Sequence, residues 1–236
     1  MMLGTLYMVP VTLGDDNLSS VIPGDVIKLV QNLEYFVVEN EKSARSFLGA
    51  VKTIKPIREL NFQVLNEHSA EKDLPKLIAP LMAGHDVGML SEAGCPGIAD
   101  PGASLADLAH RKGIKVAPLV GPSSILLSLM ASGLNGQKFS FLGYLPTDKA
   151  ARVNTLKELE KQSKQHNQTQ IFIETPYRNQ HMLEDILTSC SANTKLCIAR
   201  NVSLETEFVV SKTIAEWKKS ELPDLHKQPT VFLLLA

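Results

Sequence analysis

Short apolar runs of strand length alternate along the whole chain with segments whose apolar residues have helical spacing. The run TLYMVP at 5–10 is the first, and a second apolar strand at 34–40 follows a helical segment. The alternation continues through DVGMLS at 86–91 to TVFLLLA at 230–236. Strands that alternate with helices are typical of parallel sheets covered by helices on both faces. The sequence therefore predicts an α/β fold with a doubly wound parallel sheet in its N-terminal part.

Periodicity and turn residues place the individual elements. Strands are expected at 5–10, 34–40, 62–67, 86–91, 114–121, 139–145, 169–175, 195–200, 207–217 (with a short helical turn) and 230–236. Helices are expected at 24–33, 42–51, 69–82, 104–113, 122–133, 149–164 and 178–190. Within the fourth helix, Ser104 and Asp107 resemble a capping box. A polar break at 133–138 divides the chain into an N-terminal α/β domain, 1–135, and a C-terminal α/β domain, 136–236.

Composition narrows the class of protein. A chain of 236 residues suits two domains, and 24 basic against 25 acidic residues do not describe a basic nucleic-acid-binding module. Three cysteines without C-x-x-C spacing fit reduced thiols in a cytoplasmic protein, and six scattered histidines give no reason to expect a metal site. The most apolar stretch, 116–134, is interrupted by prolines and glycines. We therefore expect a buried strand, turn and helix there, and no membrane.

Three turns rich in glycine, proline and serine follow apolar strands, at 10–14, 91–97 and 121–124. Neither G-x-G-x-x-G nor a P-loop motif is present, so an ordinary dinucleotide-binding or P-loop protein is not indicated. In an open α/β sheet, ligands lie outside the carboxyl ends of the strands. We expect the three turns to meet there and to present backbone groups to a small polar ligand. Tight connections without a ligand are the alternative.

Five segments, in order, resemble the motifs of a known superfamily. They are LYMVPVTLGD (6–15), MLSEAGCPGIADPG (89–102), PLVGPSSILLSLMASGL (118–134), FSFLGYLP (139–146) and IFIETPYR (171–178). The resemblance is to the tetrapyrrole methylase superfamily of S-adenosylmethionine-dependent methyltransferases. Within it, the branch that methylates a cytidine ribose 2′-hydroxyl in 16S ribosomal RNA is the most similar.

The resemblance implies a fold, a cofactor and partners. The second domain is expected to contain a mixed sheet with helices, and the cofactor cleft lies between the domains. The cofactor is S-adenosylmethionine, with S-adenosylhomocysteine as product, and the partners are a second copy of the chain in a homodimer and ribosomal RNA or the 30S subunit. The first loop of the family matches Pro10 and the turn from Leu13 to Asp15. The cofactor-binding residues implied are Pro10, Leu13, Gly14, Ser91, Glu92, Ala93, Gly94, Pro96, Ile98, Ser123, Ser124, Leu142, Gly143, Tyr144, Thr175, Pro176, Ala199, Arg200, Asn201, Pro229, Thr230 and Val231.

A ribose hydroxyl is a poor nucleophile when protonated, so its methylation benefits from a general base. Glu92, Asp100 and Glu174 each follow a strand, and Glu92 and Glu174 are the catalytic candidates. For Glu92 the alternative is a carboxylate that shapes its loop. Asp100 precedes a proline and is interpreted as a turn residue.

Several other residues have both a functional and a structural interpretation. Arg178 and Arg200 could hold an acceptor phosphate, or could form surface ion pairs. Tyr144 could stack on a base or pack in the core. Cys95 lacks a histidine partner in the sequence pattern and is expected to be a packing residue. The charged helix at 149–164 is expected to present a solvated face.

The chain departs from the pattern of the ribosomal RNA branch at positions that concern the acceptor. It has Glu92 and Cys95 where the branch reads S-D-A-G-T-P, and VENEKSARSF, with Arg45 displaced, where the branch carries an acidic-Thr-Arg motif. Typical members also extend beyond the last strand. Three functions follow: an RNA ribose methyltransferase, a methyltransferase for another acceptor such as a tetrapyrrole, and a non-catalytic homologue that binds S-adenosylmethionine.

Overall fold

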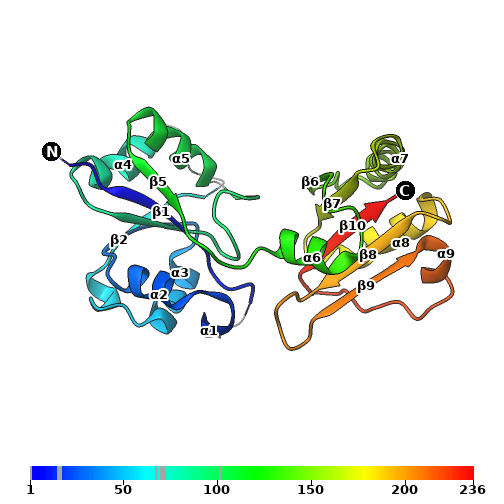
Figure 1. The fold of residues 1–236 in the computed structure, drawn as a ribbon, viewed down its shortest axis with the longest axis horizontal. Coiled ribbons are helices and arrows are strands. Elements are labelled where there is room, and N and C mark those ends of the chain that lie inside the picture. Colours follow the sequence, from blue (N-terminus) through cyan, green and yellow to red (C-terminus); the bar gives the residue numbers. More distant parts are fainter. Residues whose placement is uncertain (1, 15–17, 67–68, 70–72, 101) are drawn as a thin grey trace. The chain divides into compact units, whose positions relative to one another are not determined.

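The computed structural model describes residues 2–14, 18–66, 69, 73–100 and 102–236, which pack into two α/β units, Met1–Ser123 and Ser124–Ala236 (Figure 1). The first unit contains a parallel five-stranded sheet and the second a mixed five-stranded sheet. The α/β class predicted from the sequence is confirmed.

The first unit is built on strands and helices that alternate in the chain. Its strands are β1 (Thr5–Val9), β2 (Tyr35–Val38), β3 (Asn61–Val64), β4 (Val87–Leu90) and β5 (Lys115–Pro118). Its helices are α1 (Leu18–Val21), α2 (Gly24–Gln31), α3 (Glu41–Val51), the 3₁₀ helix η1 (Ile57–Glu59), α4 (Leu74–Met82) and α5 (Gly102–Arg111). The strand order β3-β2-β4-β1-β5 is parallel throughout, so every strand ends at the same edge of the sheet.

Two apolar cores cover the faces of this sheet. On one face, Leu48 of α3 and Val30 of α2 pack with strand residues such as Phe36. On the other, Leu81 of α4 and Leu105 of α5 pack with further strand residues (Figure 1). The helices bury amphipathic faces, which is the arrangement that their spacing predicts. Because helices cover both faces of the sheet, the loops at the ends of the strands are where this unit can present backbone groups to a ligand.

The second unit has its own sheet and core. Its strands are β6 (Phe139–Tyr144), β7 (Thr169–Ile173), β8 (Lys195–Arg200), β9 (Phe208–Thr213) and β10 (Thr230–Leu235). Its helices are α6 (Ser124–Ser132), α7 (Lys149–His166), α8 (Asn179–Ser189) and α9 (Ile214–Trp217). The order is β6-β7-β10-β8-β9; β6 and β7 are parallel and the other pairs are antiparallel. The mixed sheet is thus confirmed.

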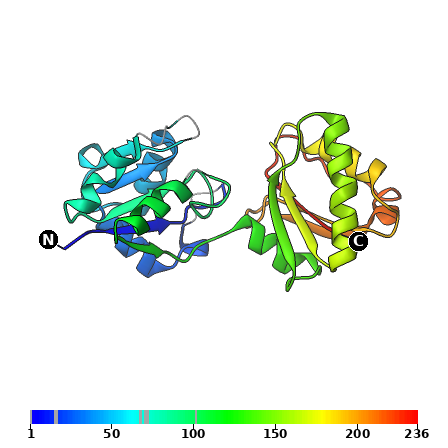
Figure 2. The ribbon, with the colours of Figure 1, turned by 90° about the horizontal axis from the view of Figure 1, so that it is seen from above.

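Helices also cover both faces of the second sheet. Leu156 of α7 and Ile186 of α8 pack with Phe172, Phe232 and other strand residues in one cluster. Figure 2 shows α7 from a second side, lying alongside this sheet. Its first turn is capped by the Asp148 carboxylate, which accepts a hydrogen bond of 2.9 Å from the Ala151 amide.

Helix α6 packs on the other face of the second sheet. Leu129 lies in one apolar cluster with Ile171, Cys197 and Val231. The division between the units therefore falls before α6, whereas the sequence places it after residue 135. Sequence periodicity identifies an apolar helix but does not say which of two sheets it covers.

Other differences from the sequence prediction are local. The short helices α1 and η1 were not predicted, and α5 begins at Gly102, two residues earlier than expected. The capping-box prediction is wrong, because Ser104 lies inside the first turn of α5 and Asp107 pairs with Arg111 at 3.0 Å. The apolar stretch 116–134 contains a strand, a turn and a helix as predicted, but the expected burial is wrong: no residue of β5 is buried, and Leu126 and Met130 of α6 are 51% and 79% exposed. No helix among the described residues is long and apolar enough to cross a membrane.

Candidate functional site

The loops that follow β1, β4 and β5 meet at the carboxyl edge of the first sheet. The Val11 amide donates a hydrogen bond of 2.9 Å to the Gly94 carbonyl, which joins the first two loops. The Cys95 thiol donates to the Pro122 carbonyl at 3.4 Å, which joins the second loop to the third. The predicted convergence of three glycine- and proline-rich turns is confirmed. These loops form one backbone-rich platform.

Glycine is required where the loops touch. A Cβ atom on Gly121 would lie 2.2 Å from Cγ of Pro10, far inside van der Waals contact. Gly94 has φ of +73°, and a Cβ atom there would lie 3.3 Å from Cδ2 of Leu13. Both positions therefore need a residue without a side chain, one for space and the other for its left-handed backbone. This explains why the sequence concentrates glycine in these turns.

Asp100 holds the second half of the β4 loop in shape. Its Oδ1 accepts hydrogen bonds from the Gly97 amide at 2.5 Å and from the Gly102 amide at 3.1 Å. This is the geometry of a turn residue, as the sequence predicts. Partial burial, with Asp100 nearby, raises the pKa of the Cys95 thiol. A protonated thiol bonded to a carbonyl fits a packing role for Cys95 better than a nucleophilic one.

Glu92 lies at the start of this loop with an exposed side chain. Its backbone amide donates to Oε2 of Glu39, at the end of β2, over 3.3 Å. Glu92 also lines a hollow of about 200 Å³ against α3, together with Thr12, Ser43 and Ser46. The Glu92 side chain is therefore open to solvent and borders a hollow lined both by hydroxyl groups and by apolar side chains such as Leu18 and Phe47.

The second unit presents another cluster of loops at one edge of its own sheet. Strand β10 runs antiparallel to β7 and β8, so its start lies beside their carboxyl ends. Thr230 pairs with Arg200, and the Asn201 amide donates to the Pro229 carbonyl at 2.9 Å. Strand β6 ends at the same edge because it is parallel to β7, with Gly143 at φ of +66° and Tyr144 exposed. The segments that follow β6, β7 and β8 and the segment that precedes β10 are thus brought together.

Glu174 and Arg178 form an ion pair at this edge. Oε1 of Glu174 accepts from Arg178 Nη2 at 2.6 Å and from the Thr175 amide at 2.6 Å. The Glu174 side chain is only 1% exposed, and its Oε2 atom is buried without a hydrogen-bond partner among the described residues. A buried carboxylate oxygen without a partner is uncommon in folded proteins, so Oε2 of Glu174 is a candidate acceptor for a hydrogen-bond donor from a ligand or water.

Polar side chains tie the remaining loops of this edge to one another. Asn201 Nδ2 donates to Gln228 Oε1 at 2.6 Å and to Thr206 Oγ1 at 2.9 Å. Asn179 Nδ2 donates to the Gln228 carbonyl at 2.6 Å. Arg200 donates from Nη1 to the Asp224 carbonyl at 2.8 Å. The guanidinium of Arg200 therefore has a backbone partner, and no carboxylate of the described residues lies within ion-pair distance of it.

Comparison with known proteins decides the family. No protein-family model matches the chain. The ribosomal RNA small subunit methyltransferase I of Vibrio cholerae is 31% identical over 211 residues, which are 89% of this chain and 69% of that protein. The Thermotoga maritima protein of the same name is 32% identical over 199 residues, with 83% and 85% covered. The chain belongs to the ribosomal RNA small subunit methyltransferase I family. The resemblance stated from the sequence motifs is thereby confirmed.

Membership of the ribosomal RNA small subunit methyltransferase I family makes the chain a methyltransferase and implies a methyl donor of the S-adenosylmethionine type. The crystal structure of the methyltransferase CobJ matches the fold with a TM-score of 0.63 at 16% identity, over 98% of this chain and 94% of that one. This likeness supports the two-unit α/β fold alone.

The residues implied by the family fall into two sets, one in each unit. The first unit holds Pro10, Leu13, Gly14, Ser91, Glu92, Ala93, Gly94, Pro96, Ile98 and Ser123. The second holds Ser124, Leu142, Gly143, Tyr144, Glu174, Thr175, Pro176, Ala199, Arg200, Asn201, Pro229, Thr230 and Val231. Asp15 lies outside the described residues. Ala199 and Val231 are buried in the cluster beneath α6, so only their main chain can face a ligand.

The sequence did not single out three residues that shape these edges. Glu39 accepts a hydrogen bond from the Glu92 amide. Gln228 accepts hydrogen bonds from the side chains of Asn179 and Asn201. Ser46 lines the hollow beside α3. The position of Glu39 at the end of an apolar strand was the available signal, because polar residues at that place face the ligand edge of an α/β sheet. For Gln228 and Ser46 the sequence carries no such signal.

Proposed function

We propose that the chain transfers a methyl group from S-adenosylmethionine to a ribose 2′-hydroxyl of ribosomal RNA in the small ribosomal subunit. The observation that carries this proposal is the convergence of the loops after β1, β4 and β5 on a platform of backbone groups. The names of the relatives, which are about 30% identical over most of the chain, give the RNA as acceptor.

The platform has the properties that a donor of this kind requires. Gly94 and Gly121 leave room for the main chain to approach a ligand, and each is fixed by its neighbours rather than free. A preorganised loop loses little entropy when a ligand binds. S-adenosylmethionine supplies a methyl group on a positively charged sulfur, which the acceptor oxygen displaces in line. We propose that the implied residues of both units serve this donor.

Glu92 is the proposed general base. Its side chain is exposed and lines a hollow with the hydroxyls of Thr12, Ser43 and Ser46, while Glu39 fixes its amide. As the bond from the ribose oxygen to the methyl carbon forms, the carboxylate accepts the proton of the 2′-hydroxyl. Proton transfer of this kind contributes about 10²- to 10⁴-fold to rate.

Glu174 is better suited to positioning than to proton transfer. Its carboxylate is buried and already accepts from Arg178 and the Thr175 amide. We propose that the pair fixes the loop after β7, and that the buried Oε2 receives a hydrogen-bond donor from the bound nucleoside. Arg178, whose side chain is 39% exposed, keeps part of its surface available to an anion.

The experiment that tests this function has two stages. Calorimetry with S-adenosylmethionine and S-adenosylhomocysteine tests donor binding. Absence of binding at millimolar donor concentration would refute the proposal. Labelled donor is then incubated with 30S subunits from cells that lack this modification. Label in the ribosomal RNA is expected, and label only in another acceptor such as a tetrapyrrole would replace the proposal.

A Glu92→Gln variant separates a catalyst from a non-catalytic binding protein. It should bind the donor with unchanged Kd and transfer methyl about 10²- to 10⁴-fold more slowly. A wild-type protein that binds the donor but transfers nothing to 30S subunits would favour the non-catalytic homologue. The homodimer stays a prediction, which light scattering of the purified protein tests.

A further inference from the structure

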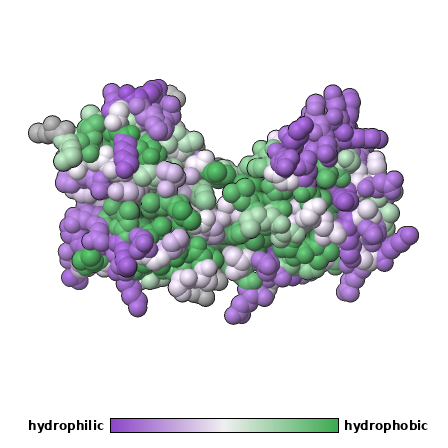
Figure 3. All heavy atoms as spheres, in the orientation of Figure 1, coloured by the Kyte–Doolittle hydropathy of each residue, from purple (hydrophilic) through white to green (hydrophobic). Residues whose placement is uncertain are grey.

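Helix α7 carries three lysines on one exposed face, away from the edge where the implied ligand residues of the second unit lie. Lys157, Lys161 and Lys164 follow the i, i+4, i+7 spacing that aligns side chains along a helix, and all three are exposed. Hydrophilic side chains gather over α7 in Figure 3. The three lysines line a groove of about 450 Å³ whose other wall is the loop between α8 and β8, with Ser191 and Asn193.

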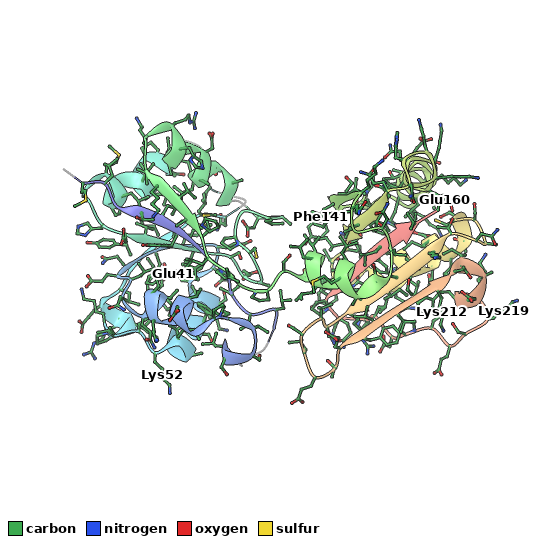
Figure 4. The ribbon with its side chains drawn as sticks, in the orientation of Figure 1. Glu41, Lys52, Phe141, Glu160, Lys212 and Lys219 are labelled. Carbon is green, nitrogen blue, oxygen red and sulfur yellow. The ribbon has the colours of Figure 1, made fainter. Side chains whose placement is uncertain are left out.

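The acidic residue on this face is already engaged. Glu160 accepts hydrogen bonds at Oε1 from the Ser191 amide at 2.7 Å and from the Thr194 hydroxyl, and at Oε2 from the Ser191 hydroxyl at 3.1 Å. Figure 4 labels Glu160 on α7. Within the described part of the chain, none of the three lysines has a carboxylate within 4.0 Å. Three lysines without a carboxylate of the described residues within ion-pair distance therefore line the groove, beside the hydrogen-bonded Glu160 and the C-terminal residue Ala236.

The position of the lysines in the helix does not account for them. Cations near a helix C-terminus interact favourably with the helix dipole, which explains Lys164 in the last turn of α7. The effect falls off within one turn, so it gives no reason for Lys157 in the middle of the helix. A rise of 1.5 Å per residue spreads the three charges over about 10 Å along the axis. A row of this length suits an extended polyanion better than a single small anion.

We propose that this groove, defined by Lys157, Lys161, Lys164, Ser191 and Asn193, binds the phosphodiester backbone of the substrate RNA. The lysines neutralise successive phosphates, and the side-chain amide of Asn193 in the loop donates a hydrogen bond to a phosphate oxygen. This inference rests on the proposed function. It assigns RNA contact to a helix that the sequence predicted only as a solvated face.

The test compares two variants that lose the same charge. The first is Lys157→Gln, Lys161→Gln and Lys164→Gln together, and the control carries the same change at Lys212, Lys218 and Lys219. Figure 4 labels Lys212 and Lys219 beside α9, apart from Glu160. Glu216 lies near Lys212 and Lys219 and partly balances their charge. Gln is a good helix former, so the α7 variant is expected to keep its helix. The control positions lie in β9 and just after α9, outside helix interiors, and circular dichroism checks the folding of both variants.

The readouts are KM for 30S subunits, kcat, donor Kd and the dependence of RNA binding on salt. Each lost phosphate contact lowers the slope of log K against log salt by about 0.7 to 0.9, so the α7 variant should lose about 2 to 3 in slope and raise KM at least about tenfold. Donor Kd and kcat should not change, and the control should keep most of the wild-type slope. Equal slopes for the two variants would overturn the proposal.

Two further outcomes are distinguishable. The same binding measurement with protein-free small-subunit RNA should show the same loss for the α7 variant. A loss seen only with intact 30S subunits would mean that the groove contacts an acidic protein, which overturns the assignment to RNA. Wild-type protein without transfer to 30S subunits would instead refute the proposed function, whatever the variants do.

Discussion

Replacing Gly121 by Ala tests whether contact between the loops builds the donor platform. The new Cβ would lie 2.2 Å from Cγ of Pro10, whereas carbon atoms rest at about 3.5 Å or more, so the loops must separate by about 1.3 Å. Overpacking of this kind costs about 1–3 kcal/mol of stability. A shift near 1 Å at a ligand site can cost about a hundredfold in function. We expect the variant to be less stable and to bind S-adenosylmethionine much more weakly.

A double-mutant cycle makes this prediction specific. In Pro10→Gly the ring is gone, and the next atom of residue 10, its Cα, lies 3.8 Å from the new Cβ in ordinary contact. The double variant should therefore lose less stability than the two single variants lose together, by at least about 1 kcal/mol in the free energy of unfolding. Denaturant unfolding gives the stabilities and calorimetry gives the donor Kd.

The matched control is Gly24→Ala at the start of α2, where a new Cβ meets no atom within 4 Å. It should leave donor binding unchanged and stability equal or slightly higher. A Gly121→Ala protein with wild-type stability and wild-type donor affinity would refute the reasoning, because the two loops would then not depend on their close approach.

Three further predictions concern the second unit. Burial raises the pKa of Cys190 and Cys197 to about 12 from 9.0, so at pH 8 a thiol reagent should modify them about a thousandfold more slowly in native than in unfolded protein; equal rates would contradict their burial. Asp185→Asn removes one partner of a buried ion pair with Arg152, joined at 2.6 Å, and should lower the free energy of unfolding by roughly 3–5 kcal/mol; a loss below about 1 kcal/mol would show that the pair is solvated. Glu174→Gln should weaken donor or acceptor binding while kcat at saturation stays within about tenfold; a larger fall in kcat would make Glu174 the base instead.

Most elements of the fold could be predicted from the sequence because their signals are local. Strand β8 was predicted at its observed bounds, since an apolar run between polar residues leaves little alternative. The turns 10–14, 91–97 and 121–124 were also located, because glycine and proline mark chain reversals at strand ends. Parallel pairing then places all three turns at one edge.

What the sequence could not predict depends on contacts between distant residues. Pro10 and Gly121 are in contact although more than a hundred residues separate them in the sequence. Neither residue type predicts a contact with the other. Glu39 reaches the amide of Glu92 only because β2 and β4 are neighbours in the sheet. Glu174 and Arg178 are only four residues apart, but the burial of the Glu174 carboxylate depends on how the rest of the unit packs around it. The sequence could therefore identify Glu92 and Glu174 as candidates, because both follow strands at a ligand edge. Their different roles, general base and positioning residue, are inferred from the partners that the structure shows.

The most direct test of the central claim is to locate the methyl group in the RNA. Small-subunit RNA is treated with the wild-type protein and labelled S-adenosylmethionine, digested, and mapped by mass spectrometry and alkaline hydrolysis. A 2′-O-methyl group blocks cleavage at the following phosphodiester because the neighbouring hydroxyl is no longer free. We predict label at a nucleotide that resists alkali, and far less of it with Glu92→Gln. Label on a base, or none in RNA from a protein that binds the donor, would contradict the account.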